Sequence, residues 1–168
     1  MSTTDRNSKC LEHVLYEFWM YLETYYYFNY LHSLNKNYQF EINMAIESHE
    51  LHLRNLMEFF YTKKPKNHPE DLRLSDILQN YDSSLTKEKV QDDFNHISRS
   101  VEHLTSHRTS INKKETIDII NKYYEDFKEK IKKIVDNLES NITNEYREDL
   151  KDENVITLFN NLKEIFRL

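Results

Sequence analysis

Apolar side chains recur along most of the chain at intervals of three and four residues. This spacing places them on one face of an α-helix. Four long segments show the pattern, over about residues 11–34, 40–61, 87–107 and 113–139. In the second segment the two intervals alternate strictly, at Ile42, Ile46, His49, Leu53, Leu56 and Phe60. The sequence therefore predicts four long amphipathic helices.

Two shorter segments complete the pattern. Ser75 and Asp76 offer an N-cap for a short helix over residues 77–81, and residues 154–166 repeat the helical spacing. Residues 62–71 contain both prolines and separate the second and third long helices. We therefore expect an all-α fold, an up-down four-helix bundle with an extra short helix and a C-terminal helix.

The composition narrows the possible sites. The chain has 168 residues and no glycine. Glycine-rich dinucleotide loops, phosphate-binding loops and the GxSxG nucleophile elbow all need glycine, so the sequence excludes them. Neither a repeat nor a shift in composition divides the chain, and we expect one helical-bundle domain over residues 1–168.

The charge and the cysteine content of the chain indicate which partners and which cellular compartment suit it. A formal net charge of -6 disfavours an extended nucleic-acid surface, because such surfaces are usually basic, but it permits a local basic pocket. The single cysteine, Cys10, fits a reducing compartment. Residues 1–9 are polar with no apolar signal segment after them, and polar residues interrupt the stretch 18–34. We expect a cytoplasmic protein that does not enter a membrane.

The third predicted long helix has a polar face opposite its apolar one. His96, His103 and His107 are seven and four residues apart, so they share one side of the helix with Arg99. A solvated surface is the simplest interpretation. Lysine and glutamate form helices better, however, and they cover the other exposed faces of this chain. The face is therefore a candidate site.

One chemistry that suits this face is cleavage of RNA without a metal or other cofactor. An arginine can hold a phosphate through paired, charge-assisted hydrogen bonds. A histidine can transfer the proton of the attacking 2'-hydroxyl or of the leaving oxygen near neutral pH. Arg99 would clamp the phosphate and His103 would act as acid and base, with His107 and His96 in support. Two copies that pair through this face would line a shared cleft.

The run Arg99-Ser100-Val101-Glu102-His103, on one helix of an all-α chain, resembles the HEPN superfamily. The family pattern is Arg, a polar residue, and His after four to six intervening residues; here Ser100 takes the polar position and three residues separate Arg99 from His103. The resemblance implies a homodimeric bundle. It further implies either a metal-independent endoribonuclease of a toxin–antitoxin or other defence system, or an inactive relative.

Two more sequence segments are similar to segments of small bacterial proteins of unassigned function. They are His52-Leu53-Arg54-Asn55-Leu56 and the run from His103 to Arg108. The similarity makes His52, Arg54, Asn55 and Arg108 secondary site candidates. Arg54 also has Glu50 and Glu58 at the helical spacing of an ion pair.

Two alternatives stay open. His103 and His107 have the spacing that puts two imidazoles on one metal ion, and His49 could be a third ligand, an arrangement similar to DinB-like bundles. For His49, at an apolar position of its own helix, a hydrogen-bonded core histidine is the simpler interpretation. The other alternative is a non-enzymatic protein-interaction module, in which the histidine-bearing face contacts a protein partner.

Overall fold

The described part of the chain is all-α. The computed structural model describes residues 3–34, 38–61, 74–79, 87–102 and 113–167. Within these ranges every element is a helix, and the one exception is an isolated bridge between Leu78 and Ile142. This confirms the predicted fold class. None of the described helices combines the length and the apolar character that a bilayer span requires.

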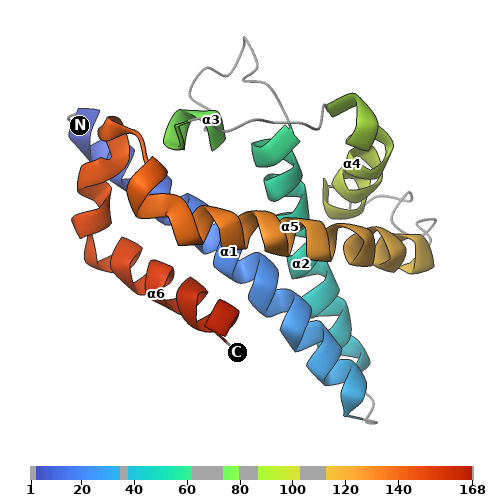
Figure 1. Cartoon of the computed structure of the whole chain (residues 1–168). Helices are drawn as coiled ribbons and strands as arrows, with labels where there is room; N and C mark the ends of the chain where they lie inside the picture. Colours follow the sequence, from blue (N-terminus) through green and yellow to red (C-terminus); the bar gives the residue numbers. More distant parts are fainter. Residues whose placement is uncertain (1–2, 35–37, 62–73, 80–86, 103–112, 168) are drawn as a thin grey trace.

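The helices pack around one long hairpin. Their bounds are α1 Thr3–Ser33, α2 Gln39–Tyr61, α3 Leu74–Ile77, α4 Lys87–Glu102, α5 Lys113–Asn141, η2 Asn144–Lys151 (a 3₁₀ helix) and α6 Glu153–Arg167. In Figure 1, α1 and α2 run antiparallel, α5 crosses them obliquely, α4 lies beside α2, and α6 lies along α1. The four long helices thus begin where the apolar spacing predicts or earlier.

The short helix is displaced from its predicted position. It spans Leu74–Ile77, not 77–81, because the chain leaves the helix after Ile77 to pair with the end of α5. The Gln79 amide donates to the Asn141 carbonyl, and the Thr143 amide donates to the Ile77 carbonyl, each at 2.8 Å. The helical spacing gave no indication of this bridge.

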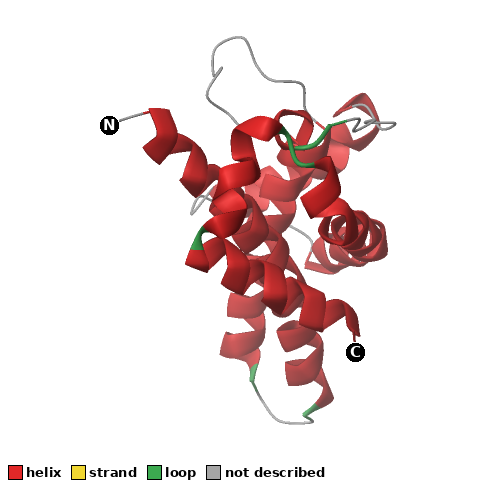
Figure 2. Ribbon diagram, turned by 60° about the vertical axis from the view of Figure 1, so that its left-hand side comes forward, coloured by secondary structure: helices red, strands yellow, loops and turns green. Residues whose placement is uncertain are grey.

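The core lies where α1, α2 and α5 cross. Phe18, Tyr21 and Phe127 are fully buried there, and Tyr21 and Phe127 have their ring centroids 5.7 Å apart. A separate small cluster of Phe28, Leu31 and Ala45 joins α1 to α2 farther along the hairpin. Figure 2 shows that this end of the hairpin extends beyond the other helices. The end therefore has few helices to cover its sides.

Candidate functional site

Two of the four predicted catalytic residues, His96 and Arg99, lie in the described part of α4. His96 is half-buried, with Nε2 3.1 Å from the Thr116 hydroxyl and Nδ1 3.6 Å from the Glu115 carboxylate, both on α5. The His96 ring therefore joins α4 to α5, whereas the helical pattern places it on the face directed away from the core. Arg99 is exposed in the last turn of α4.

The remaining predicted residues of this face fall outside the described residues. They are His103, His107 and Arg108. The convergence of Arg99 with His103, on which the nuclease hypothesis depends, thus stays a prediction. The same holds for the metal pair His103 and His107. Among the residues that the structure does describe, no group of three or more His, Cys, Asp and Glu side chains is placed to hold a metal ion.

The secondary candidates His52 and Asn55 meet at a residue that sequence reasoning missed, Glu17 of α1. His52 Nδ1 lies 2.8 Å from Glu17 Oε2, and the Asn55 amide donates to the same oxygen at 3.2 Å. The His52 ring is buried, and Glu17 is 26% exposed. Only the antiparallel pairing of α1 with α2 brings the three together, and spacing within one helix cannot reveal such a pairing.

The third secondary candidate on α2 lies on another flank of the helix. Arg54 is half-buried, and Glu50, four residues earlier, is buried. Each of these side chains has an interaction partner in the structure. Carboxylates are rarely buried without one. Arg54 and Glu50 are therefore part of the packing of α2.

His49 is a hydrogen-bonded core histidine, as the simpler interpretation predicts. Its ring is 1% exposed and stacks on Tyr21 with centroids 4.5 Å apart. The Thr24 hydroxyl donates to the Met20 carbonyl at 2.7 Å, and it lies 3.0 Å from His49 Nδ1, which suits the tautomer with its proton on Nδ1. Burial lowers the pKa of His49 to about 3, and the nearby His52 adds to this effect.

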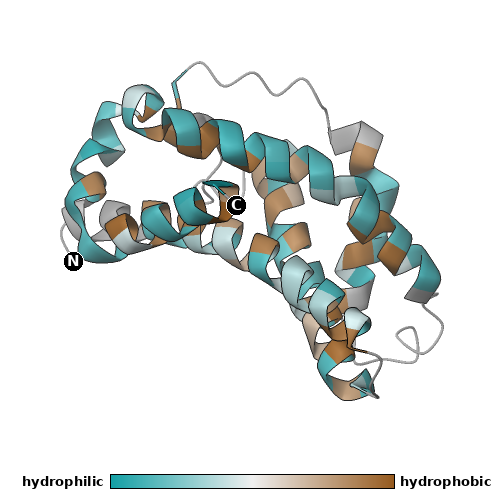
Figure 3. Cartoon of the chain, turned by 60° about the horizontal axis from the view of Figure 1, so that its bottom comes forward, coloured by the Kyte–Doolittle hydropathy of each residue, from teal (hydrophilic) through white to brown (hydrophobic). Residues whose placement is uncertain are grey.

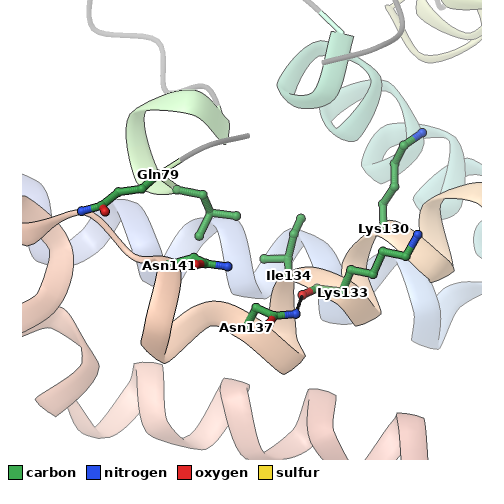
Figure 4. Close-up of a pocket in the computed structure, with 7 residues that line it drawn as sticks. Gln79, Lys130, Lys133, Ile134, Asn137 and Asn141 are labelled. Atoms are coloured by element: carbon green, nitrogen blue, oxygen red, sulfur yellow. Dashed lines mark hydrogen bonds between the residues drawn. The ribbon is translucent and has the colours of Figure 1, made fainter. Parts of the chain in front are cut away.

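A shallow groove of about 310 Å³ lies between the end of α3 and α5, away from all the predicted site residues. Its lining consists of Leu78, Gln79, Lys130, Lys133, Ile134, Asn137 and Asn141. Figure 4 shows Lys130 and Lys133 at one end and Gln79 at the other. Lys130 is already engaged, because its ammonium contacts the Asp126 carboxylate and donates to the Tyr61 hydroxyl at 2.9 Å.

Exposed apolar side chains gather on the hairpin. Among the described residues, α1 and α2 hold all the exposed large apolar side chains except Ile156 of α6, namely Tyr16, Tyr26, Tyr27, Tyr30, Phe40, Met44 and Leu51. Phe40 is 72% exposed and Tyr30 is 58% exposed. In Figure 3 the far end of the hairpin carries hydrophobic positions among hydrophilic ones. Single exposed apolar residues are ordinary, but a set gathered on one pair of helices indicates an interaction surface.

Six of these side chains form two stripes. Helical spacing puts Tyr16, Tyr27 and Tyr30 on one face of α1, and it puts Phe40, Met44 and Leu51 on one face of α2. We call these six residues the hairpin surface. The tyrosine run at residues 25–27 gave a partial signal for it, but helical spacing alone predicts packing there. What the sequence could not show is that no described helix covers Tyr27.

The two stripes adjoin at the seam between the helices. Asn55, one turn beyond Leu51, donates to Glu17 of α1. Tyr16, the residue next to Glu17, contacts the His52 ring edge-on with centroids 6.0 Å apart. The hydrogen bonds of Glu17 thus fix the two stripes beside each other.

Comparisons with protein-family models, with curated proteins and with solved structures give no match for this chain.

Proposed function

We propose that this protein is a protein-interaction module that docks a partner through the hairpin surface. The observation that carries the proposal is the exposure of large apolar side chains at helical spacing on α1 and α2, above all Phe40, Met44 and Tyr30. Aromatic residues and methionine are enriched where proteins meet. Burying such side chains against a partner removes apolar area from water, which is the main favourable term in association.

The contacts that hold α1 and α2 together beneath the hairpin surface support the proposal. The cluster of Phe28, Leu31 and Ala45 holds the far ends of α1 and α2 together, and the contacts of Glu17 and His49 hold their middle. A surface on two helices fixed in this way keeps one shape. A partner that docks on it then has little backbone entropy to remove from this side of the interface.

The types of side chain also fit a surface that must be stable before its partner arrives. Tyrosine supplies half of the hairpin surface, at Tyr16, Tyr27 and Tyr30. A tyrosine ring gives a large contact area, while its hydroxyl remains hydrated when the ring is exposed. Tyrosine is accordingly frequent among the residues that contribute most to binding.

Affinity isolation of the tagged protein from its source cells tests this function. The variant Phe40→Ser/Met44→Ser should lose its partner, because both side chains are exposed and contribute to the contact. Ile156→Ser is the matched control, since Ile156 is equally apolar, is 43% exposed, and lies on α6. Recovery of the same proteins with the double variant as with Ile156→Ser would overturn the proposal.

A second candidate function is metal-independent RNA cleavage by the α4 face. The favouring observation is the exposure of Arg99 in the last turn of α4, three residues after the half-buried His96. An arginine in this position is accessible to a phosphate. Cleavage of a single-stranded RNA in the presence of chelator should occur with the wild type and disappear in Arg99→Ala and in His103→Ala. Equal cleavage by all three proteins, or none by the wild type, contradicts this function.

A further inference from the structure

The hairpin that bears the exposed stripes is acidic. Over residues 10–34 and 38–61 the chain has one arginine, Arg54, and no lysine, and the first turns of α1 add Arg6 and Lys9. Residues 10–34 and 38–61 include seven glutamates, Glu12, Glu17, Glu23, Glu41, Glu47, Glu50 and Glu58. Helix α5, by contrast, has seven lysines and seven acidic residues, so its own charges balance. The charge of the molecule is therefore unevenly distributed, and its negative part coincides with the hairpin surface.

Two of the carboxylates lie within the stripes themselves. Glu23 is exposed seven residues after Tyr16 and four before Tyr27, which puts it on the same face of α1. Glu47 is exposed three residues after Met44, on the same face of α2 as Leu51, and it already has an interaction partner within the chain. Arg54, three residues after Leu51, is the one cation near this face, and it too has a partner within the chain. Any partner that covers the apolar side chains must lie against Glu23 and Glu47.

From this combination we infer the chemistry of the partner: an amphipathic helix whose apolar stripe is flanked by lysine or arginine. The inference rests on the proposed docking function and names its partner. Apolar anchors at helical spacing fit the paired stripes, and the flanking cations lie against the two glutamates. The pairing of opposite charges speeds association and selects this partner over others of similar shape.

The same charges disfavour the other occupants. A second copy docked through the same surface around a two-fold axis would bring the Glu23 and Glu47 carboxylates of both copies together. Nucleic acid and anionic lipid present negative charge to this surface and are disfavoured for the same reason. A basic helix is the occupant that uses both the apolar and the acidic character of the surface.

The length of the stripe sets the size of the partner. From Phe40 to Leu51 the axis of α2 rises by roughly 16 Å, at about 1.5 Å per residue. A partner helix of about three to four turns covers this distance.

Binding of two matched synthetic peptides tests the inference. One is an amphipathic helix of leucine and lysine, about 14 residues long to match the stripe, and the other replaces each lysine by glutamate. Each peptide carries a fluorescent label, and its anisotropy is measured against the purified full-length chain. The variants are Phe40→Ser/Met44→Ser for the apolar contact and Glu23→Gln/Glu47→Gln for the charge. Glu125→Gln/Glu129→Gln, at exposed positions of α5, is the matched charge control.

The Leu/Lys peptide should bind the wild type, and the Leu/Glu peptide should not. Glu23→Gln/Glu47→Gln should weaken binding by about three- to tenfold, as expected for two exposed ion pairs. Phe40→Ser/Met44→Ser should weaken it by more than about tenfold, and the α5 control should leave it unchanged. The buried glutamates are untouched in these variants, so each variant keeps the core intact.

Failure of the inference can be told apart from failure of the docking function. Equal binding of both peptides, with loss in Phe40→Ser/Met44→Ser, overturns the basic partner and leaves the docking surface. The basic partner is also overturned if the α5 control weakens peptide binding as much as Glu23→Gln/Glu47→Gln does. The inference also fails if the Leu/Lys peptide does not bind the wild type. It fails too if the wild type sediments as a dimer that Phe40→Ser/Met44→Ser dissociates, because a second copy then occupies the surface. If the peptide still binds Phe40→Ser/Met44→Ser, both the basic partner and the docking function of the hairpin surface are contradicted.

Discussion

Individual polar side chains in the middle of the hairpin fix how α1 and α2 pair. His49 reaches Thr24, while His52 and Asn55 both reach Glu17, so these three side chains of α2 have partners on α1. A shift of one helix by a turn would separate these groups, and buried polar groups without partners cost free energy. The polar contacts therefore specify the register that places the two stripes of the hairpin surface side by side.

Protonation of His49 should make the stability of the protein depend on pH. Its pKa in the folded state, about 3, lies below the ordinary value of 6.5, so between these values the unfolded chain binds a proton that the folded chain does not. The free energy of unfolding contributed by His49 is thus complete above about pH 6.5 and falls as the pH drops, by up to about 1.4 kcal/mol per pH unit. Urea unfolding at pH 7, 6 and 5 measures this dependence.

The matched variant for this test is His49→Phe. Phenylalanine keeps an aromatic ring against Tyr21, and Thr24 keeps its bond to the Met20 carbonyl. The variant should therefore lose stability less steeply than the wild type as the pH falls. His13→Gln, at an exposed position of α1, should keep the wild-type slope. Identical slopes for His49→Phe and the wild type would show that His49 does not cause the pH dependence.

Removal of the Glu17 carboxylate should destabilise the protein. Glu17→Ala leaves the buried His52 ring and the Asn55 amide without their shared acceptor, at a cost of about 1–3 kcal/mol. Glu23→Ala, on an exposed position of the same helix, is the control and should change the free energy of unfolding by less than about 0.5 kcal/mol. Chemical denaturation of both variants makes the comparison, and equal losses would argue against the role assigned to Glu17.

At the scale of elements, the four long helices could be predicted because each repeats its apolar spacing over many turns. For α2 the predicted range 40–61 and the observed Gln39–Tyr61 agree closely. The short elements could not be predicted in the same way. The position of α3 depends on the bridge between Leu78 and Ile142, and η2 is a 3₁₀ helix that buries Tyr146. Both depend on contacts between distant segments, which local spacing does not encode.

The start of α6 gives a prediction at this scale. Asp152 accepts hydrogen bonds from the main-chain amides of Asn154 at 2.8 Å and of Val155 at 3.4 Å, so it caps the helix. Asp152→Ala should lower the free energy of unfolding by about 1 kcal/mol, whereas Asp152→Asn keeps an accepting oxygen and should lose much less. Thermal unfolding of both variants measures the difference. An equal loss in both would mean that the cap is not the stabilising contact.

At the scale of the whole molecule, the fold class was predictable and the candidate site only in part. The spacing of His96 and Arg99 identified a polar face on α4, but it could not reveal that Thr116 and Glu115 of α5 contact the His96 ring. The hairpin surface depends on which helices leave α1 and α2 uncovered. That is a property of the assembled fold. From the sequence, an apolar stripe predicts only that the stripe is buried, and it does not tell whether a helix of the same chain or a partner covers it.

The central claim is that a protein partner covers the hairpin surface. The most direct measurement places a photo-crosslinking phenylalanine analogue at Phe40 in the full-length chain and irradiates the source cells. Among the described residues Phe40 is the most exposed large apolar side chain, so an analogue there leaves the core unchanged. We expect an adduct with one defined protein from position 40 and none when the analogue replaces Ile156 on α6. No adduct from position 40, or the same adducts from both positions, would contradict the claim.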